Sequence, residues 1–92
     1  MQDLITTVEI WKEGGMYTSY CPELDIASCG HTQEEARRNL MEVIRIQIEE
    51  TAKLGTLDDL LSENGYTRNG DVITTGRKVI CFEEIRIPIT VQ

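Results

Sequence analysis

The 92-residue sequence is poor in the residues that most often build catalytic and metal sites: it has one histidine, three cysteines and five aromatic residues. Cys21, Cys29 and Cys81 form no Cys-x-x-Cys pair, and their odd number argues against a disulfide framework and against structural zinc. His31 has no second histidine to complete a metal pair. No carboxylate spacing fits a metal-binding loop, and no glycine-rich phosphate motif occurs. We therefore expect no enzyme activity, no metal and no cofactor.

Basic residues are also few, since nine Lys and Arg stand against sixteen Asp and Glu, a formal net charge of −7. The excess is uneven, with −4 in residues 1–33, −4 in residues 34–63 and +1 in residues 64–92. An acidic protein repels the phosphate backbone, so we expect no direct binding of nucleic acid and favour a basic partner. The alternative is that the acidity only keeps a small domain soluble.

Long apolar runs are missing as well. Nowhere do ~18 consecutive apolar residues occur, and the first residues lack a basic region, which predicts neither a membrane span nor a signal peptide. We expect a cytoplasmic protein with one domain over residues 1–92. A chain this short buries a small core, so a homo-oligomer, a dimer or a tetramer, is also expected.

The N-terminal part of the chain predicts three strands. Residues 4–11 are rich in β-branched and aromatic side chains, which fit a pleated sheet better than a helix. The glycine pair at 14–15 supplies the positive φ that a tight hairpin turn needs. Residues 16–21 form the second strand, which Pro22 ends because proline cannot donate to the ladder. A third strand is expected at residues 26–29.

A long amphipathic helix is predicted to follow. Thr32 and the glutamate three residues later have the spacing of a capping box. Apolar residues then recur at three- and four-residue steps as far as Leu54, one stripe that suits packing on a sheet. Gly55 stands where a left-handed helix stop belongs, and Thr56 is expected to cap a shorter helix over residues 57–62.

The C-terminal part alternates between loop-like and strand-like composition. Residues 66–78 predict a loop with an Asn-Gly pair that favours a hairpin turn. Residues 79–82 and 85–91 are strand-like, and in 85–91 every second side chain is isoleucine or valine. Pro88 confines this stretch to an edge position or to an arm, residues 79–92, that reaches another subunit.

The order β-β-β-α-(α)-β predicts an α+β domain. We expect an antiparallel three-stranded sheet and a C-terminal strand, with the long helix packed on one face of the sheet. If the C-terminal strand joins the sheet beside the first strand, a right-handed crossover makes that pair parallel.

Two segments and a dipeptide after them resemble a known family. These are residues 14–24 (GGMYTSYCPEL), residues 30–36 (GHTQEEA) and Asn39-Leu40. Together they resemble the HicB-like antitoxin family of type II toxin-antitoxin systems. The resemblance implies a degenerate RNase H-like fold and a non-catalytic antitoxin. Such an antitoxin binds the HicA toxin, a small basic mRNA-cleaving ribonuclease, and blocks its active site.

Family members often add a C-terminal DNA-binding module, and we expect none in residues 73–92. The predicted partner surface combines acidic helix residues with aromatic strand residues: Glu49, Asp58, Asp59, Glu63, Trp11 and Tyr20. The acidic side chains would face the basic RNA groove of the toxin. The aromatic side chains either fill the core, the commoner case, or anchor an interface. The alternative function is a homo-oligomeric interaction module without a toxin.

Overall fold

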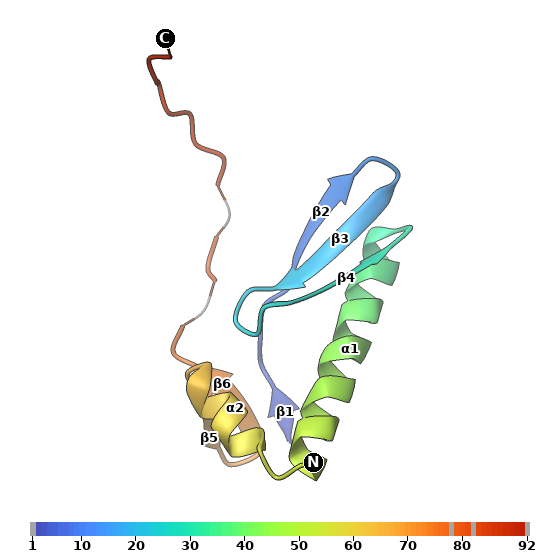
Figure 1. The fold of residues 1–92 in the computed structure, drawn as a ribbon, viewed down its shortest axis with the longest axis vertical. Coiled ribbons are helices and arrows are strands. Elements are labelled where there is room, and N and C mark those ends of the chain that lie inside the picture. The colour runs from blue at the N-terminus through green and yellow to red at the C-terminus, as the bar shows by residue number, and fades with distance from the viewer. Residues whose placement is uncertain (1, 78, 82, 92) are drawn as a thin grey trace.

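The computed structural model describes residues 2–77, 79–81 and 83–91 and shows an α+β architecture, as the sequence predicts (Figure 1). The elements follow in the order β1 (Asp3–Leu4), β2 (Glu9–Glu13), β3 (Met16–Cys21), β4 (Ile26–Gly30), α1 (Gln33–Lys53), α2 (Leu57–Glu63), β5 (Tyr66–Asn69) and β6 (Val72–Thr75). They form two three-stranded sheets, with orders β2-β3-β4 and β1-β6-β5. Within the described residues, no helix combines the length and apolarity needed to cross a membrane.

The predicted antiparallel sheet is confirmed in β2, β3 and β4. Glu13 pairs with Met16, so Gly14 and Gly15 are the two central residues of the hairpin turn. Gly14 has a φ of 59° and Gly15 has no positive φ, which is the pattern of a type II′ turn. The glycine at the first position therefore sets the register of β2 on β3.

The predicted long helix is confirmed as α1. The hydroxyl of Thr32 accepts a hydrogen bond of 3.0 Å from the amide of Glu35, as in a capping box. The carboxylate of Glu35 reaches back to the amide of His31 at 3.3 Å, one residue before the cap. At the other end Gly55 has a φ of 76°, so it stops the helix as expected.

Three contacts fix α1 on the sheet. Ser19 of β3 donates to the carbonyl of Ala36 at 2.7 Å, and Asn39 donates to the carbonyl of Cys29 at 2.9 Å. Gly30 lies so close to the helix that a Cβ built on it would be 2.6 Å from the backbone nitrogen of Ala36. Beyond this point the helix buries Leu40 against the sheet, in a core with Cys21 and Ile44.

The predicted first strand over residues 4–11 is wrong in its extent. β1 pairs in parallel with β6, whereas β2 starts at Glu9 and pairs with β3, so the chain crosses from one sheet to the other between them. The crossing is held by Thr6, whose hydroxyl lies 2.8 Å from the Tyr66 hydroxyl and 3.1 Å from the Cys21 sulfur. Sequence composition alone cannot show this division, because both halves of the segment are β-prone.

The loop predicted for residues 66–78 is wrong for residues 66–75, because β5 and β6 form a hairpin there. The hairpin turn expected in this segment does form, and residue 78 lies outside the described residues. Asn69 pairs with Val72, so the turn is centred on Gly70 and Asp71 rather than on the Asn-Gly pair, and Gly70 has a φ of 63°. Ile73 and Tyr66 from this hairpin pack with Leu61 of α2 in a second small core. Tertiary packing of these three side chains explains why a polar segment becomes a sheet.

Two further details differ from expectation. Thr56 precedes α2 but makes no side-chain capping hydrogen bond, since its φ of −111° and ψ of 12° are not those of an extended cap residue. The described residues from 79 to 91 do not form a strand, because none of them pairs with a strand of either sheet. Residues 82 and 92 of the predicted strand or arm lie outside the described residues. The parallel partner of the N-terminal strand is β6 instead.

Gly30→Ala is expected to destabilise the protein by about 1–3 kcal/mol, because the added methyl group meets helix backbone that cannot move aside. Gly15→Ala is the matched control, since a Cβ there has no neighbour within 4 Å and the backbone has no positive φ. Its stability should change by less than about 1 kcal/mol. Urea unfolding followed by circular dichroism measures both; equal midpoints for the two variants would contradict the close approach.

Candidate interaction surface

The sheet of β2, β3 and β4 has one face under α1 and one face that neither described helix covers (Figure 1). Ser19 points toward α1, as its hydrogen bond to Ala36 shows. Because successive side chains in a strand point to opposite faces, Thr18 and Tyr20 point away from the helix. Their cross-strand partners on β2 are Trp11 and Glu9.

These side chains and their neighbours form what we call the outer face: Glu9, Trp11, Glu13, Met16, Thr18 and Tyr20. At its centre the rings of Trp11 and Tyr20 lie 6.0 Å apart between centroids, tilted by 59°. This is a favourable geometry for an aromatic pair. Trp11 is 41% exposed, so the aromatic pair does not fill a core in this structure.

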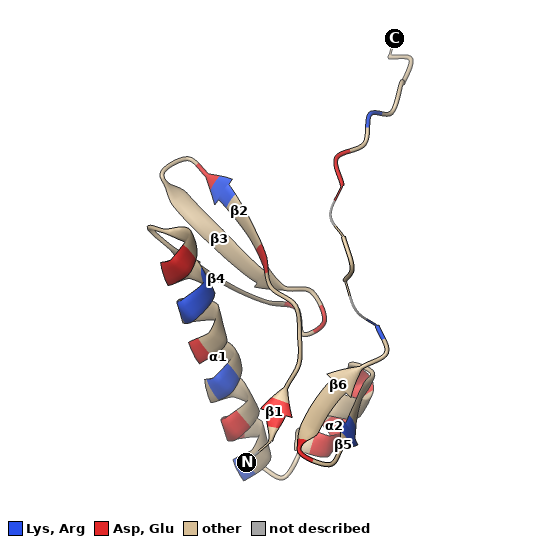
Figure 2. Ribbon diagram, turned by 180° about the vertical axis from the view of Figure 1, so that it is seen from behind, with Lys and Arg blue, Asp and Glu red and all other residues tan. Residues whose placement is uncertain are grey.

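The charges around the aromatic pair are acidic. Glu9 and Glu13 lie on either side of Trp11 along β2, and acidic residues mark both ends of this strand in Figure 2. Asp25 lies beyond β3 and accepts a hydrogen bond of 2.7 Å from the Tyr20 hydroxyl. Lys12 points to the opposite face, where its ammonium group is 5.8 Å from the centroid of the Tyr17 ring. An apolar centre is thus flanked by negative charge, and among the described residues of β2 and β3 no basic side chain lies on this face.

The hydrogen bond to Asp25 raises the pKa of Tyr20 above its ordinary value of 10.0. Smaller contributions in the same direction come from partial burial and from the negative charges of Asp25 and Glu9. The physical reason is that ionisation would remove the donated proton and place a phenolate beside a carboxylate. Tyr20 therefore stays neutral and acts as a hydrogen-bond donor across the physiological pH range.

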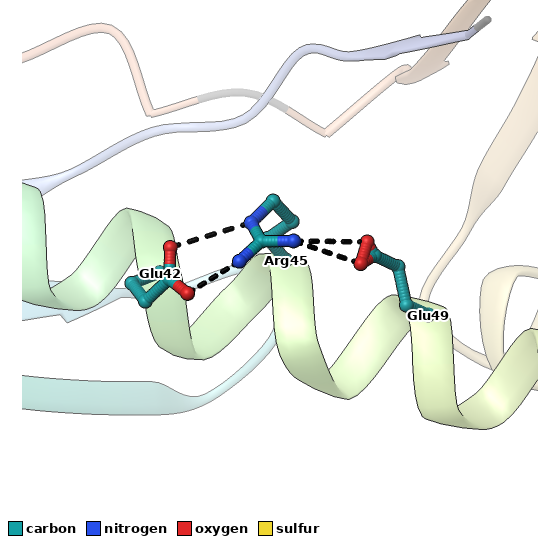
Figure 3. Close-up of polar contacts among 3 residues, drawn as sticks. All are labelled: Glu42, Arg45 and Glu49. Atoms are coloured by element: carbon teal, nitrogen blue, oxygen red, sulfur yellow. Dashed lines mark hydrogen bonds and ion pairs between the residues drawn. The ribbon is translucent and has the colours of Figure 1, made fainter.

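The structure separates the four acidic helix residues predicted for the partner surface. Glu49 lies on the exposed side of α1 and is bound by Arg45 at 2.8 Å, in an ion-pair series that also includes Glu42 (Figure 3). Asp58 on α2 forms an ion pair of 2.8 Å with Arg68 of β5. Part of the charge of both residues is already balanced within the chain.

Asp59 and Glu63 lie one turn apart on the exposed side of α2, and neither forms an ion pair with the described residues. Glu63 also lines a polar groove of about 470 Å³ together with Glu23 and Arg77. Asp59 and Glu63 form an acidic patch on α2, separate from the outer face. Of the six predicted residues, the structure therefore brings together Trp11 with Tyr20 and Asp59 with Glu63.

Sequence reasoning missed a polar cluster between the two sheets. Thr7 donates to Glu23 at 2.5 Å, and Thr6 links the hydroxyl of Tyr66 to the sulfur of Cys21, which is fully buried. Burial raises the pKa of the Tyr66 phenol. The members come from three distant segments without a shared motif, so no sequence signal could have grouped them. Their hydrogen bonds tie the sheets together, which is a structural role.

No group of three or more potential metal ligands comes together in the described part of the chain. Unpaired cysteines are commonly buried, but of the three only Cys21 is buried here, and Cys29 and Cys81 are exposed. Cys29 lies on β4 opposite Thr18, so it extends the same uncovered side of the sheet.

No family model, curated protein or solved structure matches this chain. Functional inference therefore depends on the outer face and its charges.

Asp25→Asn is expected to lower the titration midpoint of Tyr20 toward 10, because the strongest acceptor and the nearest negative charge are removed together. Asparagine tolerates the left-handed backbone at this position, where φ is 55°. Carbon-13 NMR of the labelled tyrosine rings as a function of pH measures the midpoint.

Glu13→Gln is the control, since Glu13 also lies on the outer face but does not contribute to the shift of Tyr20. It should leave the midpoint unchanged. An unchanged midpoint in Asp25→Asn would show that the hydrogen bond does not control Tyr20.

Proposed function

We propose that the chain is a non-catalytic antitoxin of the HicB type, which binds a small basic HicA-type ribonuclease through the outer face and blocks its active site. The observation that carries this proposal is the Trp11–Tyr20 pair on an uncovered sheet face, with Glu9, Glu13 and Asp25 around it. Aromatic residues at the centre of a patch with a polar rim are typical of energetically important interface residues.

The charge pattern supports a basic partner. A ribonuclease carries positive charge where it holds the RNA backbone, and the acidic rim of the outer face is complementary to such a groove. Electrostatic attraction of this kind accelerates association and selects the orientation, whereas the aromatic centre slows dissociation. The acidic patch of Asp59 and Glu63 lies on a different element and adds long-range attraction.

The segments that resemble HicB antitoxins also support the proposal. Residues 14–24 include the whole of β3, whose Tyr20 belongs to the outer face. Residues 30–36 and Asn39 contain the contacts that dock α1 on the opposite side of the same sheet. The resemblance therefore covers the β3 half of the outer face and the contacts that support the sheet, whereas Glu9, Trp11 and Glu13 of β2 lie outside it.

Trp11→Ala is expected to weaken toxin binding by about 2 kcal/mol, roughly thirtyfold in Kd, because it removes the central aromatic side chain. Met41→Ala is the matched control: Met41 is 60% exposed on α1, and its truncation should not change Kd. Isothermal titration calorimetry with a purified HicA-type toxin measures binding, and an RNA-cleavage assay measures inhibition.

Equal loss of affinity in both variants, or no loss in Trp11→Ala, would contradict an interface on the outer face. Absence of any toxin binding by the wild-type chain would contradict the antitoxin function itself. The alternative function, a homo-oligomeric module without a toxin, is favoured by the exposed isoleucines near the C-terminus.

Glu13→Lys is expected to lower the association rate constant by about tenfold at low salt, because it places positive charge beside Trp11. Asp59→Lys makes the same charge change on α2 and should have a smaller effect. Stopped-flow kinetics at several salt concentrations compares them. A larger effect of Asp59→Lys would assign the interface to the acidic patch on α2 instead.

A further inference from the structure

The C-terminal segment has the pattern of a strand but lacks a strand partner within the described part of its own chain. Alternate apolar residues in this segment form what we call the isoleucine row: Ile85, Ile87, Ile89 and Val91. Each of them is between 66% and 80% exposed. Four apolar side chains on one side of an extended chain are costly to leave in water, so this side is suited to cover an apolar surface.

An acceptor for such a strand exists at the free edge of β2. Among the described strands β2 pairs with β3 alone, so backbone groups of alternate residues on its other side lack described strand partners. A groove of about 480 Å³ lies along this region, lined by residues 7–11 on one side and residues 79–81 on the other. Its apolar lining includes Val8, Ile10 and Ile80.

Within one chain, the isoleucine row does not pair with the free edge of β2. Ile80 is 92% exposed although it lines the groove, and the segment beyond it extends away from the sheets (Figure 1). At ~3.3 Å per residue, residues 79–91 reach roughly 40 Å when extended. This exceeds the 30 and 22 Å widths of the molecule, so the segment can cross to a neighbouring copy.

We propose that residues 85–91 add as a strand to the free edge of β2 in a second copy of this chain, and that the exchange is reciprocal. Each copy carries one donor segment and one β2 edge, so a two-fold dimer pairs both segments with both β2 edges. β4 and β5 are also edge strands, but the groove lined by residues 79–81 lies beside β2. A partner protein with a different sequence would need both a free sheet edge and an apolar strand of its own to make the same reciprocal exchange.

Two other observations agree with this exchange. Pro88 cannot donate to a ladder, and it is tolerated in the outermost strand of a sheet, which is the position the segment would take. The two buried cores are small, with three buried residues in each cluster, so additional apolar burial between copies stabilises the fold. The proposal concerns the protein alone and does not depend on a toxin.

Ile89→Lys and Thr90→Lys test the exchange with adjacent positions that face opposite sides of the segment. Size-exclusion chromatography with light scattering gives the mass of each full-length variant. Wild type and Thr90→Lys should have twice the mass of the single chain, whereas Ile89→Lys should have the mass of one chain at the same concentration. A monomeric wild type, or a dimeric Ile89→Lys variant, would overturn the proposal.

The acceptor edge is tested by mixing isotope-labelled and unlabelled copies. In a filtered NMR experiment, isoleucine methyl groups of the row in one copy should show cross-peaks to Ile10 or Trp11 of the other. Cross-peaks only to residues of β4 or β5 would place the segment at a different edge and would overturn the assignment to β2. Both measurements use the protein without toxin, so they are independent of the outcome of the toxin-binding experiments.

Discussion

The close approach of α1 to the sheet at Ala36 is the constraint on which the main sheet depends. Gly30 provides the space for the helix backbone, and Ser19 and Asn39 connect helix and sheet by hydrogen bonds in both directions. Because these contacts lie at the first turns of α1, they set which side of the helix meets the sheet. Leu40 and Ile44 then enter the core one and two turns later.

The position of α1 on one side leaves the other side of the sheet uncovered, and this produces the proposed binding surface. Alternation along β3 sends Ser19 to the helix and Tyr20 to the outer face, where Tyr20 meets Trp11. The same alternation puts Glu9 and Glu13 beside Trp11, while Lys12 goes to the opposite face. A sheet with one covered and one open face can thus combine a stable core with an acidic, aromatic interface.

The polar crossing at Thr6 divides the molecule into two parts, each with a small core. Because Leu4 joins β6 and Glu9 joins β3, the N-terminal segment belongs to both sheets. This division shortens β2, whose outer edge is left free, and the C-terminal segment carries the apolar pattern that suits this edge. The small cores and the unpaired strand pattern are the two features that the proposed exchange between copies would use, because it would bury further apolar surface.

The sequence by itself determined the local elements whose signals are local: the glycine turn at Gly14, the capped helix from Thr32 to Gly55, and the alternation of residues 85–91. Tertiary structure alone decided the division of residues 4–11 between two sheets and the hairpin of β5 and β6, because both depend on side chains distant in sequence, such as Thr6 and Tyr66. It also decided that Trp11 and Tyr20 lie outside the core and that Glu49 and Asp58 are paired with arginines. Turns and caps involve neighbours a few residues apart, whereas burial and ion pairing are set by which surfaces meet after the chain has folded.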